Sequence, residues 1–227
     1  MKNIAIIPAR GGSKRILRKN IKLFMGRPII AYSIEVALQS KLFDEVMVST
    51  DDDEIAKIAK EYGAKVPFMR STETANDFAP LSSVVDEVLM YYSNNGFYFD
   101  NFCCILATAP LLTTCDLTEA YNLLSSSDFD TIRPVIKFSY PIQRAFRLND
   151  SNSVEWFSSE FSQSRSQDLE PAYHDAGLFY WGISSAGLES LKRGAIVIPE
   201  HRCQDIDTEE DWKIAEYKYK VINGFDI

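Results

Sequence analysis

The chain of 227 residues is 46% hydrophobic and 25% charged, with a formal net charge of −8, a composition typical of a soluble globular protein. The acidic balance argues against binding to nucleic acid or to an anionic membrane surface, and no apolar run approaches the roughly 20 residues of a membrane-spanning helix. The four cysteines form no CxxC pair and the sequence shows no signal peptide, so we expect a cytoplasmic protein with reduced thiols.

Apolar runs that predict strands alternate along the chain with amphipathic stretches that predict helices. In chain order we expect a strand at 3–8, a helix at 28–41, a strand at 45–50, a helix at 52–62, a short strand at 65–69, a helix at 81–92, a strand at 102–108, a helix near 116–125, a strand near 131–136, strands at 177–183 and 195–199, and a last helix at about 208–221. Gly63 stands where a helix C-terminus favours glycine. The alternation predicts one α/β domain, 1–227, with a mainly parallel sheet and a site beyond the carboxyl ends of its strands.

Residues 137–173 break this pattern. The segment is rich in Ser, Asn, Gln and aromatic residues and shows no clean period. It is too aromatic for a disordered linker, because low hydrophobicity is what keeps linkers unfolded. We interpret it as an inserted arm that packs against another subunit, and a pair of irregular surface hairpins is the alternative interpretation.

A basic, glycine-containing loop follows the first predicted strand. Within thirteen residues it gathers six cations and no acid: Arg10, Lys14, Arg15, Arg18, Lys19 and Lys22. A strand that runs into Gly11-Gly12-Ser13 can turn its backbone N–H groups into one concavity, which binds phosphate oxygens. The spacing matches neither GxxxxGK[ST] nor GxGxxG, which argues against an ATPase P-loop and a dinucleotide fold. The alternative is a solvated basic loop.

The complete string P-A-R-G-G-S-K-R-x-x-x-K-N at 8–20 is far more specific than its glycines alone. Further motifs follow it: Ser49-Thr50-Asp51-Asp52, Arg70 before a Thr-Glu pair, Asp77 ahead of Ser82, Thr108-Ala109-Pro110, Gln167-Asp168-Leu169 and Asp205-Ile206-Asp207-Thr208. From residue 4 to about residue 212, the chain resembles the cytidylyltransferases that activate nonulosonic acids, the sialic acid group and its relatives. The resemblance implies a Rossmann-like nucleotidyltransferase fold (the nucleotide-diphospho-sugar transferase fold), CTP as donor, Mg²⁺ as cofactor, and a homodimer in which the arm crosses between subunits.

Within that family the chain is similar to the pseudaminic acid branch. The sialic acid enzymes usually carry Gln at the position of Ala107, an Arg-Gln-Asp string where this chain has Ser-Gln-Asp at 166–168, and Asn-Gly in the stretch at 173–177. The strings A-T-A-P, S-Q-D-L and Y-H-D-A-G-x-F-Y-W-G match the pseudaminic acid branch instead. The chain departs from that branch at Leu17, where proline is usual, and at Leu178, where glutamine is usual.

The resemblance and the loop chemistry together assign roles to individual residues. The predicted nucleotide-binding residues are Ala9, Arg10, Gly11, Gly12, Ser13, Lys14, Lys19, Asn20, Arg70, Asp77, Ser82 and Ala107. The predicted sugar-binding residues are Arg165, Gln167, Tyr173, His174 and Asp175. The predicted catalytic residues are Arg10, Lys19 and Asp207.

Two carboxylates near the C-terminus form the candidate metal site. Residues i and i+2 of an extended segment point to the same side, so Asp205 and Asp207 would direct two carboxylates at one point. Mg²⁺ favours one or two carboxylates together with substrate phosphates and waters. The alternative is that Asp207 or Thr208 caps the last helix. The acidic cluster at 51–53 is predicted to be a helix N-terminus.

The sugar side is less specific. His174 is predicted to contact the sugar, and a structural role is its alternative, since the two histidines lack metal-ligand spacing. Arg165 is the expected partner of the sugar carboxylate because guanidinium groups bind carboxylates in a bidentate manner, and Arg144 and Arg147 compete for that role.

The leading functional hypothesis is an enzyme that transfers CMP from CTP to the anomeric hydroxyl of a nine-carbon keto-sugar acid, pseudaminic acid, and releases pyrophosphate. The alternatives are a CMP-N-acetylneuraminate or CMP-legionaminate synthetase, a nucleotidyltransferase with another base or sugar, and a catalytically inactive nucleotide-binding subunit.

Overall fold

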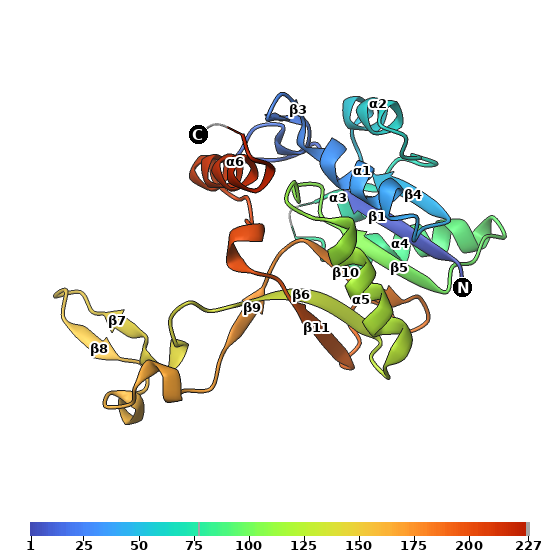
Figure 1. Cartoon of the computed structure of the whole chain (residues 1–227). Helices are drawn as coiled ribbons and strands as arrows, with labels where there is room; N and C mark the ends of the chain where they lie inside the picture. The colour runs from blue at the N-terminus through green and yellow to red at the C-terminus, as the bar shows by residue number, and fades with distance from the viewer. Residues whose placement is uncertain (77, 226–227) are drawn as a thin grey trace.

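In a computed structural model that describes residues 1–76 and 78–225, the centre of the protein is a seven-stranded sheet (Figure 1). Its strand order is β11-β6-β10-β5-β1-β4, and β9 pairs with β6 beyond this path. The strands are β1 (Asn3–Pro8), β4 (Glu45–Ser49), β5 (Asn101–Ile105), β6 (Thr131–Lys137), β9 (Tyr173–Asp175), β10 (Phe179–Ile183) and β11 (Arg193–Val197).

The sheet is mixed, with most of its strands in one direction. Strand β1 pairs in parallel with β4 and β5, and β11 pairs in parallel with β6. Strand β10 is antiparallel to both β5 and β6, and β9 is antiparallel to β6. Strands β1, β4, β5, β6 and β11 therefore share a direction, which confirms the predicted mainly parallel α/β sheet.

Helices cover both faces of the sheet. One face packs against α1 (Ile29–Ser40), α2 (Asp53–Glu61) and α5 (Thr114–Ser126), and the other packs against α4 (Leu81–Asn94). Strands β1 and β5 alternate between the two clusters, as expected for strands buried on both faces. The last helix, α6 (Glu209–Asn223), packs with the start of α1 in a third cluster. In the described part of the chain, no helix combines the length and apolarity needed to cross a membrane.

Local capping explains where these helices begin. The Asp52 side chain accepts hydrogen bonds from two backbone N–H groups of α2, at 3.0 and 3.1 Å, which confirms the acidic cluster as a helix N-terminus. Thr113 and Thr208 form capping boxes at the starts of α5 and α6. Gly63 follows α2 with φ +94°, as predicted for a helix C-terminus.

The predicted strand at 65–69 is wrong. Only Lys65 pairs there, through an isolated parallel bridge to Met47. Pro67 has no N–H to donate, so the segment cannot continue the ladder. The prediction also missed the small hairpin of β2 (Leu23–Phe24) and β3 (Arg27–Pro28), and the four-residue helix α3 (Thr72–Ala75).

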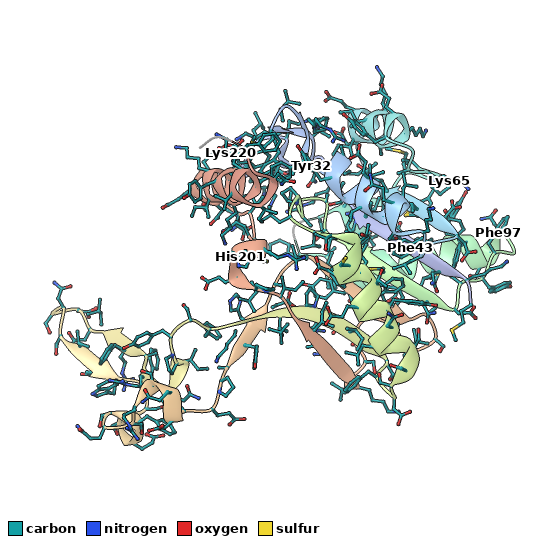
Figure 2. The ribbon with its side chains drawn as sticks, in the orientation of Figure 1. Tyr32, Phe43, Lys65, Phe97, His201 and Lys220 are labelled. Atoms are coloured by element: carbon teal, nitrogen blue, oxygen red, sulfur yellow. The ribbon has the colours of Figure 1, made fainter. Side chains whose placement is uncertain are left out.

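The 137–173 segment extends away from the sheet (Figure 1). Strands β6 and β9 pair at its base, where Lys137 lies opposite Tyr173. Farther out, β7 (Phe146–Leu148) and β8 (Val154–Trp156) form a hairpin, accompanied by three short 3-10 helices, η2 (Ile142–Arg144), η3 (Ser159–Phe161) and η4 (Ser166–Asp168). Figure 2 shows the side chains of this segment grouped around these elements, apart from the labelled residues in the rest of the protein.

Candidate active site

The basic loop is tied to the protein by its own polar groups. The Asn20 side chain donates a hydrogen bond to the Arg10 carbonyl oxygen at 2.9 Å, which closes the loop. The Gly11 N–H donates to the Asp51 carboxylate at 2.9 Å. Arg18 forms an ion pair with Asp52, the N-cap residue of α2. The loop is therefore held from both ends, and the Arg18 cation takes part in this attachment.

Four cations of the loop, Arg10, Lys14, Arg15 and Lys19, line a cavity of about 340 Å³ at the carboxyl ends of β1 and β5. Its polar lining consists of Arg10, Ser13, Lys14, Arg15, Lys19, Asn20, Arg70, Thr74, Asn76, Thr108, Asp205 and Asp207. A concave, strongly cationic site at the carboxyl ends of parallel strands is the expected location for a phosphate-containing ligand.

Asp205 and Asp207 line the same cavity as the cations. The Asp207 carboxylate accepts a hydrogen bond from Arg15 at 2.9 Å and lies 3.5 Å from the Lys19 Nζ. The Lys19 Nζ also donates to the Ile206 carbonyl oxygen at 2.7 Å. Desolvation raises the pKa of Asp205, the negative charge of Asp207 raises it further, and Lys19 opposes the rise. Thr208 caps α6, so the Asp207 side chain remains available to the cavity.

Arg70 forms the buried wall of the site. Its guanidinium donates to the Ser49 hydroxyl at 2.9 Å and to the Ser49 carbonyl oxygen, and the residue is 7% exposed. Burial lowers the pKa of Arg70, and the charge of Asp51 acts against that change. The arginine is therefore fixed in place before any ligand binds, as preorganised electrostatic stabilisation requires.

The cavity brings together much of the predicted nucleotide site. Among the described residues that line it are Arg10, Ser13, Lys14, Lys19, Asn20, Arg70 and Ala107. Ala9, Gly11 and Gly12 belong to the same loop but are not among those described lining residues, and neither is Ser82, in the first turn of α4. The predicted residue Asp77 lies outside the described residues.

The predicted sugar-binding residues lie elsewhere in the chain. None of Arg165, Gln167, Tyr173, His174 and Asp175 is among the described residues that line the nucleotide cavity. Arg165 and Gln167 lie in the 137–173 segment, where Arg165 pairs with Asp168 at 2.9 Å. The other three form β9, and the His174 ring packs against Phe138 with ring centroids 4.8 Å apart.

The sequence prediction also left out residues that line the cavity. Arg15, the hydrogen-bond partner of Asp207, was counted in the basic loop but given no role. Its position next to Lys14 was the available signal. Thr74 and Asn76 reach the cavity from α3 and the loop after it, where no sequence period pointed to a site.

Residues 4–179 match the family model described as Cytidylyltransferase. The chain belongs to the cytidylyltransferase family. It is 46% identical over 226 residues to the pseudaminic acid cytidylyltransferase of Campylobacter jejuni, with 97% of each chain covered. It is 41% identical over 228 residues to the CMP-N,N'-diacetyllegionaminic acid synthase of Legionella pneumophila, with 95% of each chain covered. These similarities confirm the predicted family and make the protein a nucleotidyltransferase.

The fold agrees with this membership. The protein matches the structure of CMP:2-keto-3-deoxy-manno-octonic acid synthetase, solved with CTP, at a TM-score of 0.70 and 18% sequence identity, over 99% of this chain and 100% of the other. The predicted Rossmann-like nucleotidyltransferase fold is thereby confirmed.

Proposed function

We propose that this cytidylyltransferase transfers CMP from CTP to the anomeric hydroxyl of a nonulosonic acid, pseudaminic acid, and releases pyrophosphate. The observation that carries the proposal is the 46% identity, over 97% of both chains, to the pseudaminic acid cytidylyltransferase of C. jejuni. The cavity supports it chemically, because Arg10, Lys14 and Lys19 line it together with Asp205 and Asp207. A lining that combines several cations with two carboxylates suits a triphosphate and its metal ion.

The proposed reaction is a displacement at phosphorus. The anomeric oxygen of the sugar bonds to the α-phosphorus of CTP, the bond from that phosphorus to the bridging oxygen of the β-phosphate breaks, and pyrophosphate leaves with the electron pair. Arg10, Lys14 and Lys19 stabilise the negative charge that moves onto the leaving group. We assign the proton of the attacking hydroxyl to the Asp207 carboxylate, which lines the cavity beside these cations.

We propose Mg²⁺ as the cofactor, with Asp205 and Asp207 as its protein ligands. Their chemistry fits, because Mg²⁺ prefers oxygen ligands and takes one or two carboxylates with phosphate oxygens and waters. The Asp205 carboxyl is desolvated and lies near the negative charge of Asp207. A bound cation would reduce the repulsion between these two carboxylates. When bound, the metal would supply positive charge to the reacting phosphate.

We also propose a homodimer formed through the 137–173 arm. Large apolar side chains in this segment are exposed on the single chain: Tyr140, Ile142, Phe146, Leu148, Val154 and Phe157. A surface of this kind marks a contact with another molecule, and a second copy of the chain gives a closed two-fold assembly. The variant Leu148→Asp/Phe157→Asp should sediment as a monomer, whereas Leu191→Asp, at an 89% exposed site outside the arm, should not change the assembly. A double variant that stays dimeric would leave the arm as a surface hairpin.

We further propose that the reaction takes place in the cytoplasm. CTP is available there, and the four cysteines, all free in the structure, would stay reduced.

Pyrophosphate release with a panel of nucleotides and sugars tests the function. CTP, UTP, GTP and ATP are each offered with pseudaminic, legionaminic and N-acetylneuraminic acids, and the products are identified by mass and NMR. We expect turnover with CTP and pseudaminic acid. Legionaminic acid is the second candidate, because the chain is 41% identical to the Legionella CMP-N,N'-diacetyllegionaminic acid synthase. A preference for that sugar would refute the assignment of pseudaminic acid. Activity only with another nucleotide would refute the base assignment, and nucleotide binding without turnover would indicate an inactive subunit.

A further inference from the structure

Arg133, in the middle of β6, is a cation that has no well-formed partner within residues 1–76 and 78–225. Its side chain is 27% exposed, and among the described residues its guanidinium donates no hydrogen bond. The Nε atom is buried and unpaired. The nearest carboxylate oxygen, Asp175 Oδ2, lies 3.6 Å from Nη1, whereas charged N–H···O⁻ hydrogen bonds are roughly 2.7–2.9 Å long. Such a group calls for an acceptor that the protein itself does not provide.

Only one carboxylate oxygen of Asp175 accepts hydrogen bonds from the described residues. Its Oδ1 accepts hydrogen bonds from the Gly177 N–H at 2.8 Å and from the Tyr180 hydroxyl at 3.0 Å. Its Oδ2 lies 3.6 Å from Arg133 Nη1 and accepts no hydrogen bond from the residues that the structure describes. The Tyr180 ring also supports the guanidinium, whose Cζ lies 5.5 Å from the ring centroid. An open donor and an open acceptor therefore lie side by side on a rigid support.

This pair lines a cavity of about 230 Å³, whose walls include Leu81, Tyr180, Leu188 and Arg193. A water molecule takes up about 30 Å³ in the liquid, so the cavity can hold a larger group. Leu81 also lines the nucleotide cavity, which makes the two cavities neighbours. On the other side, a Cβ at Gly177 would lie 3.4 Å from the Asp205 Cγ, so the turn after Asp175 contacts the candidate metal site.

The charges of the cavity favour a neutral polar group. Arg133 and Arg193 are balanced there by Asp175 and Glu189, so an added carboxylate would meet two acids as well as two bases. An amide carbonyl accepts from a guanidinium without that repulsion. The leucine side chains provide an apolar surface for a methyl group. Donor, acceptor and apolar wall together match an N-acyl group on a polyhydroxylated ring.

We propose that Arg133 recognises an N-acyl group of the acceptor sugar, with the acyl carbonyl oxygen bound by its guanidinium and the acyl methyl placed against Leu81 and Leu188. The proposal rests on the proposed function, in which the acceptor is a sugar of this class, and the sugar named for the Legionella relative carries two N-acetyl groups. Arg133 then acts in sugar specificity, and Asp175 positions it while remaining able to accept a hydrogen bond from the sugar.

The test separates recognition from folding by comparing sugars. Arg133→Met removes the donors and keeps the length of the side chain, and Arg133→Lys keeps the charge but loses the planar fork. Steady-state kinetics use CTP with the di-N-acetylated sugar and with its two mono-deacetylated analogues. A hydrogen bond to a charged donor implies that Arg133→Met raises the KM for the diacetylated sugar by about 10- to 100-fold. The KM for CTP should change by less than about twofold, and with one of the two analogues the penalty should disappear.

A matched control is Arg27→Met. Like Arg133, Arg27 lies near a carboxylate, that of Glu35, and over a tyrosine ring, that of Tyr32. Arg27 is not among the described residues that line either cavity. Equal sugar KM values for wild type and Arg133→Met, or the same penalty with all three sugars, would overturn the proposal. If Arg133→Met does not fold, the sugar dependence of Arg133→Lys decides in the same way. Wild-type enzyme that uses none of the sugars would refute the proposed function itself, which is a distinct result.

Discussion

Lys19 offers the sharpest test of the cationic site. Its Nζ lies 2.7 Å from the Ile206 carbonyl oxygen and 3.5 Å from the Asp207 carboxylate, and its side chain is 22% exposed. Two unit charges at 3.5 Å attract by about 5 kcal/mol at an effective dielectric constant of about 20, before desolvation is subtracted. A phosphate group at a similar distance from the Lys19 Nζ would be stabilised by an attraction of similar size. We expect Lys19→Met to lower kcat by roughly 10²- to 10³-fold, the effect of removing one preorganised stabilising group.

The same change has a smaller effect on the fold. Loss of the charged hydrogen bond to Ile206 should reduce the free energy of unfolding by about 1.5–3 kcal/mol. Lys22→Met is the matched control, since Lys22 belongs to the same loop but binds Glu209 at 2.6 Å, outside the described lining of the cavity. It should keep wild-type turnover and lose about 0–1 kcal/mol of stability. Pyrophosphate release and urea unfolding measure both effects. A folded Lys19→Met enzyme with turnover within about threefold of wild type would remove Lys19 from the mechanism.

Three further predictions concern the loop and the proposed metal site. A Cβ at Gly11 would lie 2.6 Å from the Asp52 Oδ2, whereas a Cβ at Gly12 would meet nothing within 4 Å. Calorimetry should therefore show that Gly11→Ala binds CTP more weakly and loses about 1–3 kcal/mol of stability. Gly12→Ala should change the stability little. The hydrogen bond from Arg18 holds the pKa of Asp52 below its ordinary value, so the pair stabilises the fold above about pH 4 and that contribution is lost as the pH falls through the folded-state pKa. Urea titrations should show Arg18→Met less stable by about 1 kcal/mol at neutral pH, with the difference closing in acid, and a pH-independent difference would contradict this. EDTA should abolish turnover reversibly, and Asp205→Asn should raise the Mg²⁺ concentration needed for half-maximal rate by about tenfold or more, whereas EDTA-resistant turnover would exclude the metal.

The fold was predictable where periodicity and capping act locally. Strand β1 was predicted with its observed bounds. The continuous apolar run that forms β5 is typical of a strand that is covered on both faces of the sheet. The error at 65–69 arose because an apolar run was given more weight than Pro67, which has no N–H for a ladder. The β2–β3 hairpin escaped because two-residue strands carry no measurable period.

The same distinction between local and long-range information applies to the candidate site. The loop at 8–20 is contiguous, so its chemistry is visible in one stretch of sequence, and four of its cations, Arg10, Lys14, Arg15 and Lys19, line a common cavity. Arg133 was missed because it lies inside a predicted strand, where a lone cation suggests only an exposed position. Its significance depends on Asp175 and Tyr180, which are more than forty residues away in the chain and reach it through the pairing of β6 with β9 and β10. Such a juxtaposition is a property of the topology, and local sequence patterns do not contain it.

The arrangement of charge explains how an acidic protein maintains a cationic loop. Arg18 and Lys22 point away from the cavity and are held by acids of the neighbouring helices α2 and α6. Arg15 and Lys19 are held by Asp207, which lies inside the cavity. In the ligand-free protein Asp207 therefore compensates cations that would otherwise repel one another across the cavity. In the proposed reaction, a bound triphosphate would take over that compensation, and the Asp207 carboxylate would then be released for the proposed metal ion or for a proton.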